Sequence, residues 1–393
     1  MEPDIISGKR EAWVDWMRAA ACFMVMVIHS TEPFYLGGDG SLILTRADAF
    51  WVSFFDSFVR ASVPVFVVAS SYLQFPLHYS TAEFFKRRVA RIIPPFLFWT
   101  LVYALVWGEP VRNIYDLLLN FNYAAGHLWF IYMLLGIYLL MPLLSSWART
   151  VGRRELGFYL ILCLFTSFIP FIREHMAGDN VAFMFSTGGI PMQGLYPLWG
   201  EACWNEFGLF YYLSGFIGYI LLGLYLRRFV GPLSTRRTLA LAIPCFLLGF
   251  AISSGGFLRR VFASCDNVFP IGGDTTLAAG WETPWTYCTV SVAMMTIGWV
   301  LMFRLCNKDG LFYQRVLLPV SRASYGMYLC HMLLLSYFSS LFRGIMGIGE
   351  NGVAGIWTTP VEIILCAVCT FVCAAAFSVL VQRIPKVGRW IIG

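Results

Sequence analysis

The sequence predicts an all-α, polytopic membrane protein with about ten transmembrane helices. Of its 393 residues, 59% are hydrophobic and only 13% are charged, and the mean hydropathy is +0.69. Soluble domains usually contain about 25% charged residues, so this chain has too few polar side chains to cover a surface that faces water. The apolar residues also gather in stretches of about 20, the length that an α-helix needs to cross about 30 Å of hydrocarbon.

Stretches of high hydropathy predict helices along the whole chain. They cover residues 17–36, 51–73, 89–107, 128–148, 155–173, 207–226, 238–257, 286–305, 323–342 and 359–382. The charged segment before the first helix lacks the apolar core and cleavage site of a signal peptide, so we expect that helix to be retained. We expect one domain over residues 1–393, without an appended soluble domain. The longest outer segments, 174–206 and 258–285, are rich in carboxylates and tryptophans, which suit sugar recognition as well as an ordinary interfacial surface.

The distribution of basic residues predicts that both termini are cytoplasmic. With the N-terminus inside, 21 of the 28 Lys and Arg residues fall in cytoplasmic segments, as the positive-inside rule requires. The net charge of +6 follows from the same bias. Because these residues are dispersed over helix ends and form no single basic face, we expect membrane lipid and no nucleic acid as a partner.

The first helix carries a polar stripe on an otherwise apolar surface. Asp15, Arg18, Cys22, Val25 and His29 follow helical steps of three and four and therefore share a face. Arg18 and His29 are about 16 Å apart along the axis, a length comparable to a phosphopantetheine arm. Arg18 could thus hold phosphates at the membrane surface while a thioester lies beside His29. The alternative is an arginine that snorkels to the interface and a histidine that only packs.

The densest basic cluster, residues 86–91, is a second candidate for phosphate binding. Arg88 and Arg91 are spaced i and i+3, so they point the same way on a helix. Their planar guanidinium groups suit the 3'-phosphate and pyrophosphate of CoA. An ordinary cytoplasmic anchor would have the same composition. Pro94 and Pro95 follow directly, and we expect the helix to bend or restart there.

Three residues are candidates for contact with a second substrate on the outer side. His127 and Trp129 precede or open the helix 128–148, where an aromatic face can stack on a sugar ring. The alternative for both is a simple boundary position in an interfacial aromatic belt. Glu32 lies three residues beyond His29, from where it could contact an acceptor or orient the imidazole. Asp15 is three residues before Arg18 and fourteen before His29, so it is better placed to support Arg18 than to orient His29.

The cysteines indicate packing rather than a metal site. Cys366, Cys369 and Cys373 share a helical face but have no His or carboxylate beside them, so we expect no metal. Cys203 and Cys265 fall in predicted outer segments and could form a disulfide in an oxidising compartment.

Five segments, in this order along the chain, carry a resemblance to a known family. They are Arg18 followed after ten residues by His29, and the segments 62–73, 87–95, 127–132 and 321–331. Together they resemble the characteristic segments of the acyltransferase-3 family of integral membrane acyltransferases. Ser71 stands where the family usually has Gly, a departure that concerns helix packing and not the chemistry.

The resemblance implies a membrane O-acetyltransferase that uses acetyl-CoA as its acyl donor and has no permanently bound cofactor. His29 would be the catalytic residue, as a general base or as an acyl carrier. Arg18, Arg88 and Arg91 would bind the phosphates of the donor. His331, a second intramembrane histidine, would then be a supporting hydrogen-bonding residue. The implied acceptor is a hydroxyl of a surface glycan or of a lipid-linked sugar precursor, and the implied location is the bacterial inner (cytoplasmic) membrane.

Two other classes of protein fit the same composition. A proton-coupled transporter or flippase for a glycan or small acid would also have about ten helices with inward-facing charges, and His29 and Glu32 would relay its protons. A non-catalytic membrane partner of a polysaccharide synthase is the third possibility. Acyl-CoA binding separates them, since only the enzyme requires it.

Overall fold

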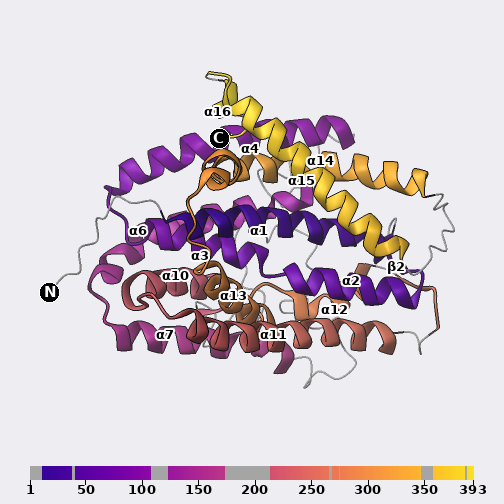
Figure 1. Cartoon of the computed structure of the whole chain (residues 1–393), viewed down its shortest axis with the longest axis horizontal. Helices are drawn as coiled ribbons and strands as arrows, with labels where there is room; N and C mark the ends of the chain where they lie inside the picture. Colours follow the sequence, from indigo (N-terminus) through magenta and orange to yellow (C-terminus); the bar gives the residue numbers. More distant parts are fainter. Residues whose placement is uncertain are drawn as a thin grey trace.

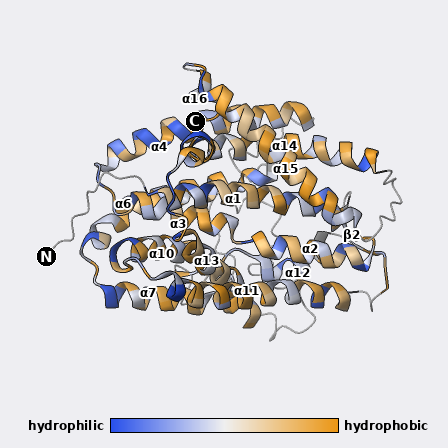
Figure 2. Ribbon diagram, viewed as in Figure 1, coloured by the Kyte–Doolittle hydropathy of each residue, from blue (hydrophilic) through white to orange (hydrophobic). Residues whose placement is uncertain are grey.

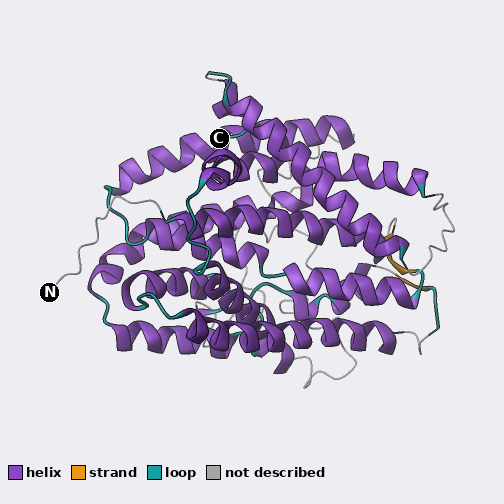
Figure 3. Ribbon diagram, viewed as in Figure 1, coloured by secondary structure: helices purple, strands orange, loops and turns teal. Residues whose placement is uncertain are grey.

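The prediction of an all-α polytopic protein is confirmed. The computed structural model describes residues 11–37, 40–107, 123–172, 213–264, 268–273, 275–346, 357–385 and 387–393. Helices make up most of these residues, and the few strands lie together near one end (Figure 3). Eight described helical stretches are long and apolar enough to cross a membrane: Ala12–Phe34, Arg46–Gln74, Thr81–Trp107, Gly126–Thr150, Arg153–Ile172, Thr235–Ala263, Thr283–Phe303 and Thr358–Gln382.

Most of the long helices run along the long axis of the molecule, and α1 (Ala12–Thr31) passes through the middle (Figure 1). It packs against α2, α3, α13, α14 and α15. The remaining helices are α2 (Arg46–Val59), α3 (Ser62–Gln74), α4 (Thr81–Trp107), η2 (Tyr123–Leu128), α6 (Trp129–Thr150), α7 (Arg153–Thr166), α10 (Ile217–Phe229), α11 (Thr235–Ala263), α12 (Thr275–Trp281), α13 (Val290–Phe303), α14 (Leu318–Ile345), α15 (Thr358–Gln382) and α16 (Val387–Ile391). The central position of α1 means that its polar stripe faces other helices and not lipid.

The outer surface of this bundle is apolar. Large side chains such as Leu105 on α4 and Leu143 on α6 are 66% and 77% exposed. Orange, hydrophobic residues follow the lengths of the helices, while blue, hydrophilic residues gather at helix ends (Figure 2). Such a surface suits hydrocarbon rather than water.

The eight spans correspond to eight of the ten expected helices. The other two expected helices, 207–226 and 323–342, overlap α10 and α14. The helix α14 has 28 residues, but buried polar side chains such as Ser321 and His331 make it less apolar. Residues 207–212 lie outside the described part of the chain. The total of ten spans and the cytoplasmic position of both termini stay predictions.

The expected span over 51–73 lies within the stretch Arg46–Gln74, but it consists of two helices and not one. The chain forms α2 and α3 with a break between them at Arg60 and Ala61. The nitrogen of Pro64 carries no hydrogen, so it cannot donate to the carbonyl of Arg60 and continue the helix. The break leaves the guanidinium group of Arg60 buried between helices.

Of the bend or restart expected at Pro94 and Pro95, the restart does not occur. The helix α4 already begins at Thr81 and includes both prolines without interruption. The hydroxyl of Tyr325 donates to the carbonyl of Ile92 at 2.9 Å, so a neighbouring helix supports the backbone beside the prolines. As a result, the basic cluster is part of a regular helix and keeps its i, i+3 geometry.

A small cap closes the end of the bundle where the strands lie. The strands β1 (Leu36–Gly37), β2 (Gly40–Ile43) and β3 (Ile271–Gly273) pair antiparallel in that order. Behind them, α12 and the turn η5 (Thr283–Trp285) bury Trp281 and Trp285. The rings of Phe257 and Trp285 stack at 4.0 Å between centroids. The segment 258–285, expected to be one long loop, is therefore folded over most of its length.

Candidate active site

A cavity of about 300 Å³ lies between α1, α3, α4, α6 and α14. It brings together six of the seven site residues expected from the sequence. These are Arg18, His29, Arg88, Arg91, His127 and Trp129. The seventh, Glu32, is not part of the lining but contacts His29. Residues from distant parts of the sequence therefore line one cavity.

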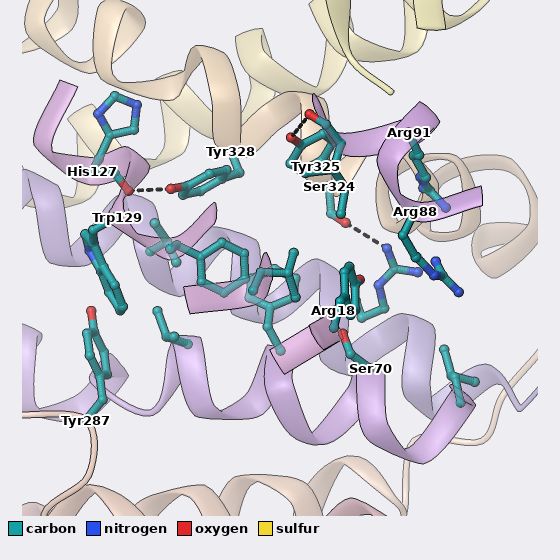
Figure 4. Close-up of a pocket in the computed structure, with 18 of the residues that line it drawn as sticks. Arg18, Ser70, Arg88, Arg91, His127, Trp129, Tyr287, Ser324, Tyr325 and Tyr328 are labelled. Carbon is teal, nitrogen blue, oxygen red and sulfur yellow. Dashed lines mark hydrogen bonds between the residues drawn. The ribbon is translucent and has the colours of Figure 1, made fainter. Parts of the chain in front are cut away.

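Three arginines lie at one end of the cavity (Figure 4). Arg18 extends from α1 and donates through Nη2 to the hydroxyl of Ser324 on α14 at 3.1 Å. Arg88 and Arg91 extend from α4, and the guanidinium carbon of Arg88 lies 5.6 Å from the ring centroid of Tyr138. Among the described residues, the Nε of Arg88 is buried and has no hydrogen-bond partner. Guanidinium groups bind phosphate through charge-assisted hydrogen bonds, so this end can hold a polyanion.

Asp15 fixes the helix that supports Arg18. Its buried carboxylate accepts hydrogen bonds from the hydroxyls of Tyr313 at 2.8 Å and Ser321 at 2.6 Å. Tyr313 precedes α14, and Ser321 lies in the first turn of α14, three residues before Ser324. Asp15 and Arg18 are therefore both linked to α14, the first through Ser321 and the second through Ser324. Direct support of Arg18 by Asp15 stays a prediction.

The imidazole of His29 is held by a carboxylate. Its Nδ1 lies 2.8 Å from Oε1 of Glu32, the i+3 contact that the sequence allowed. The side chains of His29 and Glu32 are 17% and 29% exposed, so water screens this contact only in part. A carboxylate at Nδ1 fixes the ring and leaves Nε2 as the nitrogen available to a substrate.

Two further histidines lie beside His29. The ring of His331 is 5.1 Å from that of His29 and 5.2 Å from that of His127, measured between centroids. The Nδ1 of His331 contacts the carbonyl of Tyr328 at 2.5 Å, and the hydroxyl of Tyr328 donates to the carbonyl of His127. Within the described ranges, the Nε2 atoms of His127 and His331 are buried without a hydrogen-bond partner. The three imidazoles form a cluster that we call the histidine cluster.

Aromatic rings form the end of the cavity opposite the arginines (Figure 4). Trp129 stacks on Tyr287 with 5.3 Å between centroids and an interplanar angle of 27°. The ring centroid of Phe216 lies 6.3 Å from that of Trp129 and 6.2 Å from that of Tyr287. His127 and Trp129, which the sequence placed on the acceptor side, are therefore separated from the arginines by the length of the cavity.

Several charged side chains surround the buried Arg60, which contacts the ring of Tyr287. The guanidinium of Arg60 lies 5.1 Å from the ring centroid of Tyr287, and its Nη1 is 3.2 Å from Oδ1 of Asp56. Its Nη2 is 3.9 Å from Oε2 of Glu282, and the hydroxyl of Tyr35 donates to Oε1 of Glu282 at 2.6 Å. Burial raises the pKa of Glu282, and Arg60 and Tyr35 offset this in part. This group connects the cap to the aromatic end of the cavity.

Sequence reasoning did not place His331 or Arg60 in the site. His331 was expected only as a supporting residue, yet it touches the rings of both cavity histidines. A signal was available on α14, since Ser324, Tyr328 and His331 follow helical steps of four and three and share a face. The expected pairing of Cys203 with Cys265 lies outside the described residues.

Comparison with known proteins identifies one family. The family model described as an acyltransferase domain matches residues 11–379, which is nearly the whole chain. No curated protein and no solved structure matches the chain. The matched range includes every residue that lines the cavity.

Proposed function

The chain belongs to the acyltransferase-3 family of membrane acyltransferases, and from that premise we propose that it is an acetyl-CoA-dependent O-acetyltransferase. The acetyl group would pass from acetyl-CoA in the cytoplasm to a hydroxyl of a surface glycan or of a lipid-linked sugar precursor. The enzyme would act in the bacterial inner membrane.

The observation that carries this proposal is that one cavity has arginines at one end and imidazoles towards the other. CoA is a polyanion joined to its thioester by a long, narrow arm. Arg18, Arg88 and Arg91 would bind its phosphates through charge-assisted hydrogen bonds. The spacing of Arg18 and His29, about 16 Å along one helix, would then leave the thioester beside the imidazole.

The chemistry would centre on Nε2 of His29. Glu32 holds the opposite nitrogen and would stabilise the positive charge that develops on the ring during the reaction. The stacked rings of Trp129 and Tyr287 offer a flat face to a sugar at the other end of the cavity. Donor and acceptor would thus approach the imidazole from different ends.

Acetyl-CoA binding to detergent-purified protein, measured by calorimetry, tests the proposal. Arg88→Ala should weaken binding about 10- to 150-fold, because a hydrogen bond to a charged group contributes about 1.5–3 kcal/mol. Arg87→Ala is the matched control. Arg87 neighbours Arg88 on α4 but is exposed, pairs with Glu83 at 2.5 Å and does not line the cavity. Binding should be unchanged in this control.

Transfer completes the test, with [¹⁴C]acetyl-CoA as donor and methyl glycosides of glucose, galactose and N-acetylglucosamine as acceptors. His29→Ala should bind acetyl-CoA and abolish transfer. If the correctly folded wild-type protein does not bind acetyl-CoA, the proposal fails and the transporter becomes the better interpretation. Equal loss of binding in Arg87→Ala and Arg88→Ala would refute the assignment of the phosphate site.

A further inference from the structure

The histidine cluster contains more imidazoles than a direct transfer requires. If His29 only removed the hydroxyl proton, one base would suffice. His127 and His331 are nevertheless 6% and 0% exposed, and each has a buried Nε2 without a hydrogen-bond partner among the described residues. Buried polar atoms are normally paired, because an unpaired one costs about 1–3 kcal/mol. Such atoms in a membrane helix call for a functional explanation.

The three rings are not equivalent. His29 and His127 line the cavity, whereas His331 lies behind them and contacts both rings. His29 is the one ring of the three with a carboxylate at hydrogen-bond distance among the described residues. His331 donates through Nδ1 to the carbonyl of Tyr328, since a carbonyl can only accept, so its Nε2 carries the lone pair when the ring is neutral.

We propose, on the basis of the function proposed above, that the reaction has two steps in which His29 carries the acetyl group and His127 activates the acceptor. In the first step, Nε2 of His29 attacks the thioester carbonyl, the C–S bond breaks and CoA leaves as a thiolate. The thiolate takes a proton from water when CoA is released. The product of this step is an acetyl-imidazolium at His29, which keeps its Nδ1 proton towards the carboxylate of Glu32.

In the second step, the acceptor oxygen attacks the acetyl carbon. The C–N bond breaks and returns its electron pair to Nε2 of His29, while the hydroxyl proton passes to Nε2 of His127. This nitrogen is buried in the structure, so the ring of His127 would turn towards the cavity to accept the proton. A second base is necessary here because His29 is occupied by the acetyl group. His331 would accept a hydrogen bond from the protonated ring of His127. His127 would afterwards release the proton to water.

Tyr328 holds the second base and its neighbour in one unit. Its side-chain hydroxyl donates to the backbone carbonyl of His127, and its own carbonyl accepts from His331. The ring of Tyr328 also lines the cavity. One residue of α14 thereby fixes the position of both histidines relative to the substrate.

Isotope exchange separates the two steps. The purified protein is incubated with acetyl-CoA and [³H]CoA in the absence of any acceptor, and label in acetyl-CoA is measured. We expect exchange by the wild type and by His127→Ala, and none by His29→Ala. In the full reaction with the methyl glycosides, His127→Ala should lose transfer at least about 100-fold.

Two variants guard against a purely structural effect. His127→Gln keeps a hydrogen-bonding group but cannot act as a base at neutral pH, so it should lose transfer as His127→Ala does. Recovery of transfer in His127→Gln would overturn the inference. His78→Ala, a change at an exposed histidine outside the cavity, should exchange and transfer like the wild type.

The outcomes distinguish this inference from the proposed function. A wild-type protein that transfers acetyl groups but shows no exchange would refute the two-step reaction and leave the acetyltransferase intact. Loss of exchange in His127→Ala, with acetyl-CoA binding preserved, would refute the role of His127. A wild type that neither binds acetyl-CoA nor transfers from it would refute the function itself.

Discussion

Replacing Glu32 by Gln tests whether its charge activates His29. The two side chains meet at 2.8 Å between Nδ1 and Oε1, and both are less than one third exposed. Gln has nearly the shape of Glu and keeps an oxygen that can accept from Nδ1. The substitution therefore removes the negative charge and leaves the hydrogen bond in place.

The size of the effect follows from the difference between the two hydrogen bonds. A hydrogen bond to a charged group contributes about 1.5–3 kcal/mol and a neutral one about 0.5–1.5 kcal/mol. The transition state, in which the ring becomes positive, should thus lose about 1–2 kcal/mol of stabilisation. This corresponds to a fall in kcat of about 5- to 30-fold. Glu32→Ala removes the whole interaction and should lower kcat about 10- to 150-fold.

The assay is transfer from [¹⁴C]acetyl-CoA under steady-state conditions, with kcat and the KM for the donor determined separately. The KM for acetyl-CoA should stay the same, because Glu32 does not line the cavity. Glu83→Gln is the matched control, since that carboxylate forms an exposed i, i+4 pair with Arg87. A kcat of Glu32→Gln equal to that of the wild type would refute the role of the charge. A rise in donor KM without a change in kcat would contradict the assignment of Glu32 to the chemical step.

Three further substitutions test the surroundings of the site. Arg60→Met leaves the fully buried Asp56 without its cation and should destabilise the protein by about 3–5 kcal/mol; a thermal melt in detergent equal to that of the wild type would contradict this. Gly249→Ala places a Cβ 2.4 Å from a backbone carbonyl of α13 and should cost about 1–3 kcal/mol, whereas Gly255→Ala on the same helix meets nothing within 4 Å and should melt normally. Trp129→Ala should raise the acceptor KM about 2- to 12-fold, the equivalent of one aromatic stacking interaction of about 0.5–1.5 kcal/mol, and an effect on the donor KM alone would count against acceptor binding.

Sequence could predict those site residues that lie on one face of a single helix. Arg18 and His29 share a face because the period of an α-helix is regular, and the structure keeps both on the wall of one cavity. Arg88 and Arg91 were found in the same way. Glu32 was reachable because a residue three positions after His29 stays close to it even as α1 gives way to the turn that follows.

The break between α2 and α3 could have been predicted from the sequence, but a hydropathy average over a long window does not show it. A window of about 20 residues averages over single positions, and residues 51–73 are apolar on average although they include Asp56 and Arg60. Pro64 was the local signal, because a proline without its N–H marks the place where a helical hydrogen bond is missing. Attention to that residue would have predicted two helices and a polar residue, Arg60, at their junction.

The partners of His331 and Arg60 could not be predicted from one sequence. His331 is 302 positions from His29, and nothing in the local pattern of α14 says which of its neighbours will face it. Glu282 and Arg60 come from the cap and from the break after α2, and their pairing depends on how the cap folds over the bundle. Tertiary packing, not helical periodicity, decides such contacts.

The packing of α14 on α1 explains why the two ends of the cavity keep their separation. At one end, Ser324 of α14 accepts from Arg18 of α1; at the other, His331 of α14 lies against His29 of α1. Each helix thus contributes one residue to the phosphate end and one to the imidazole end. Two rigid helices that contact each other at both ends fix the distance between the arginines and the histidines better than loops could. In the proposed function, the helix pair would then select a donor of defined length, and Trp129 and Tyr287 at the aromatic end would contact the acceptor.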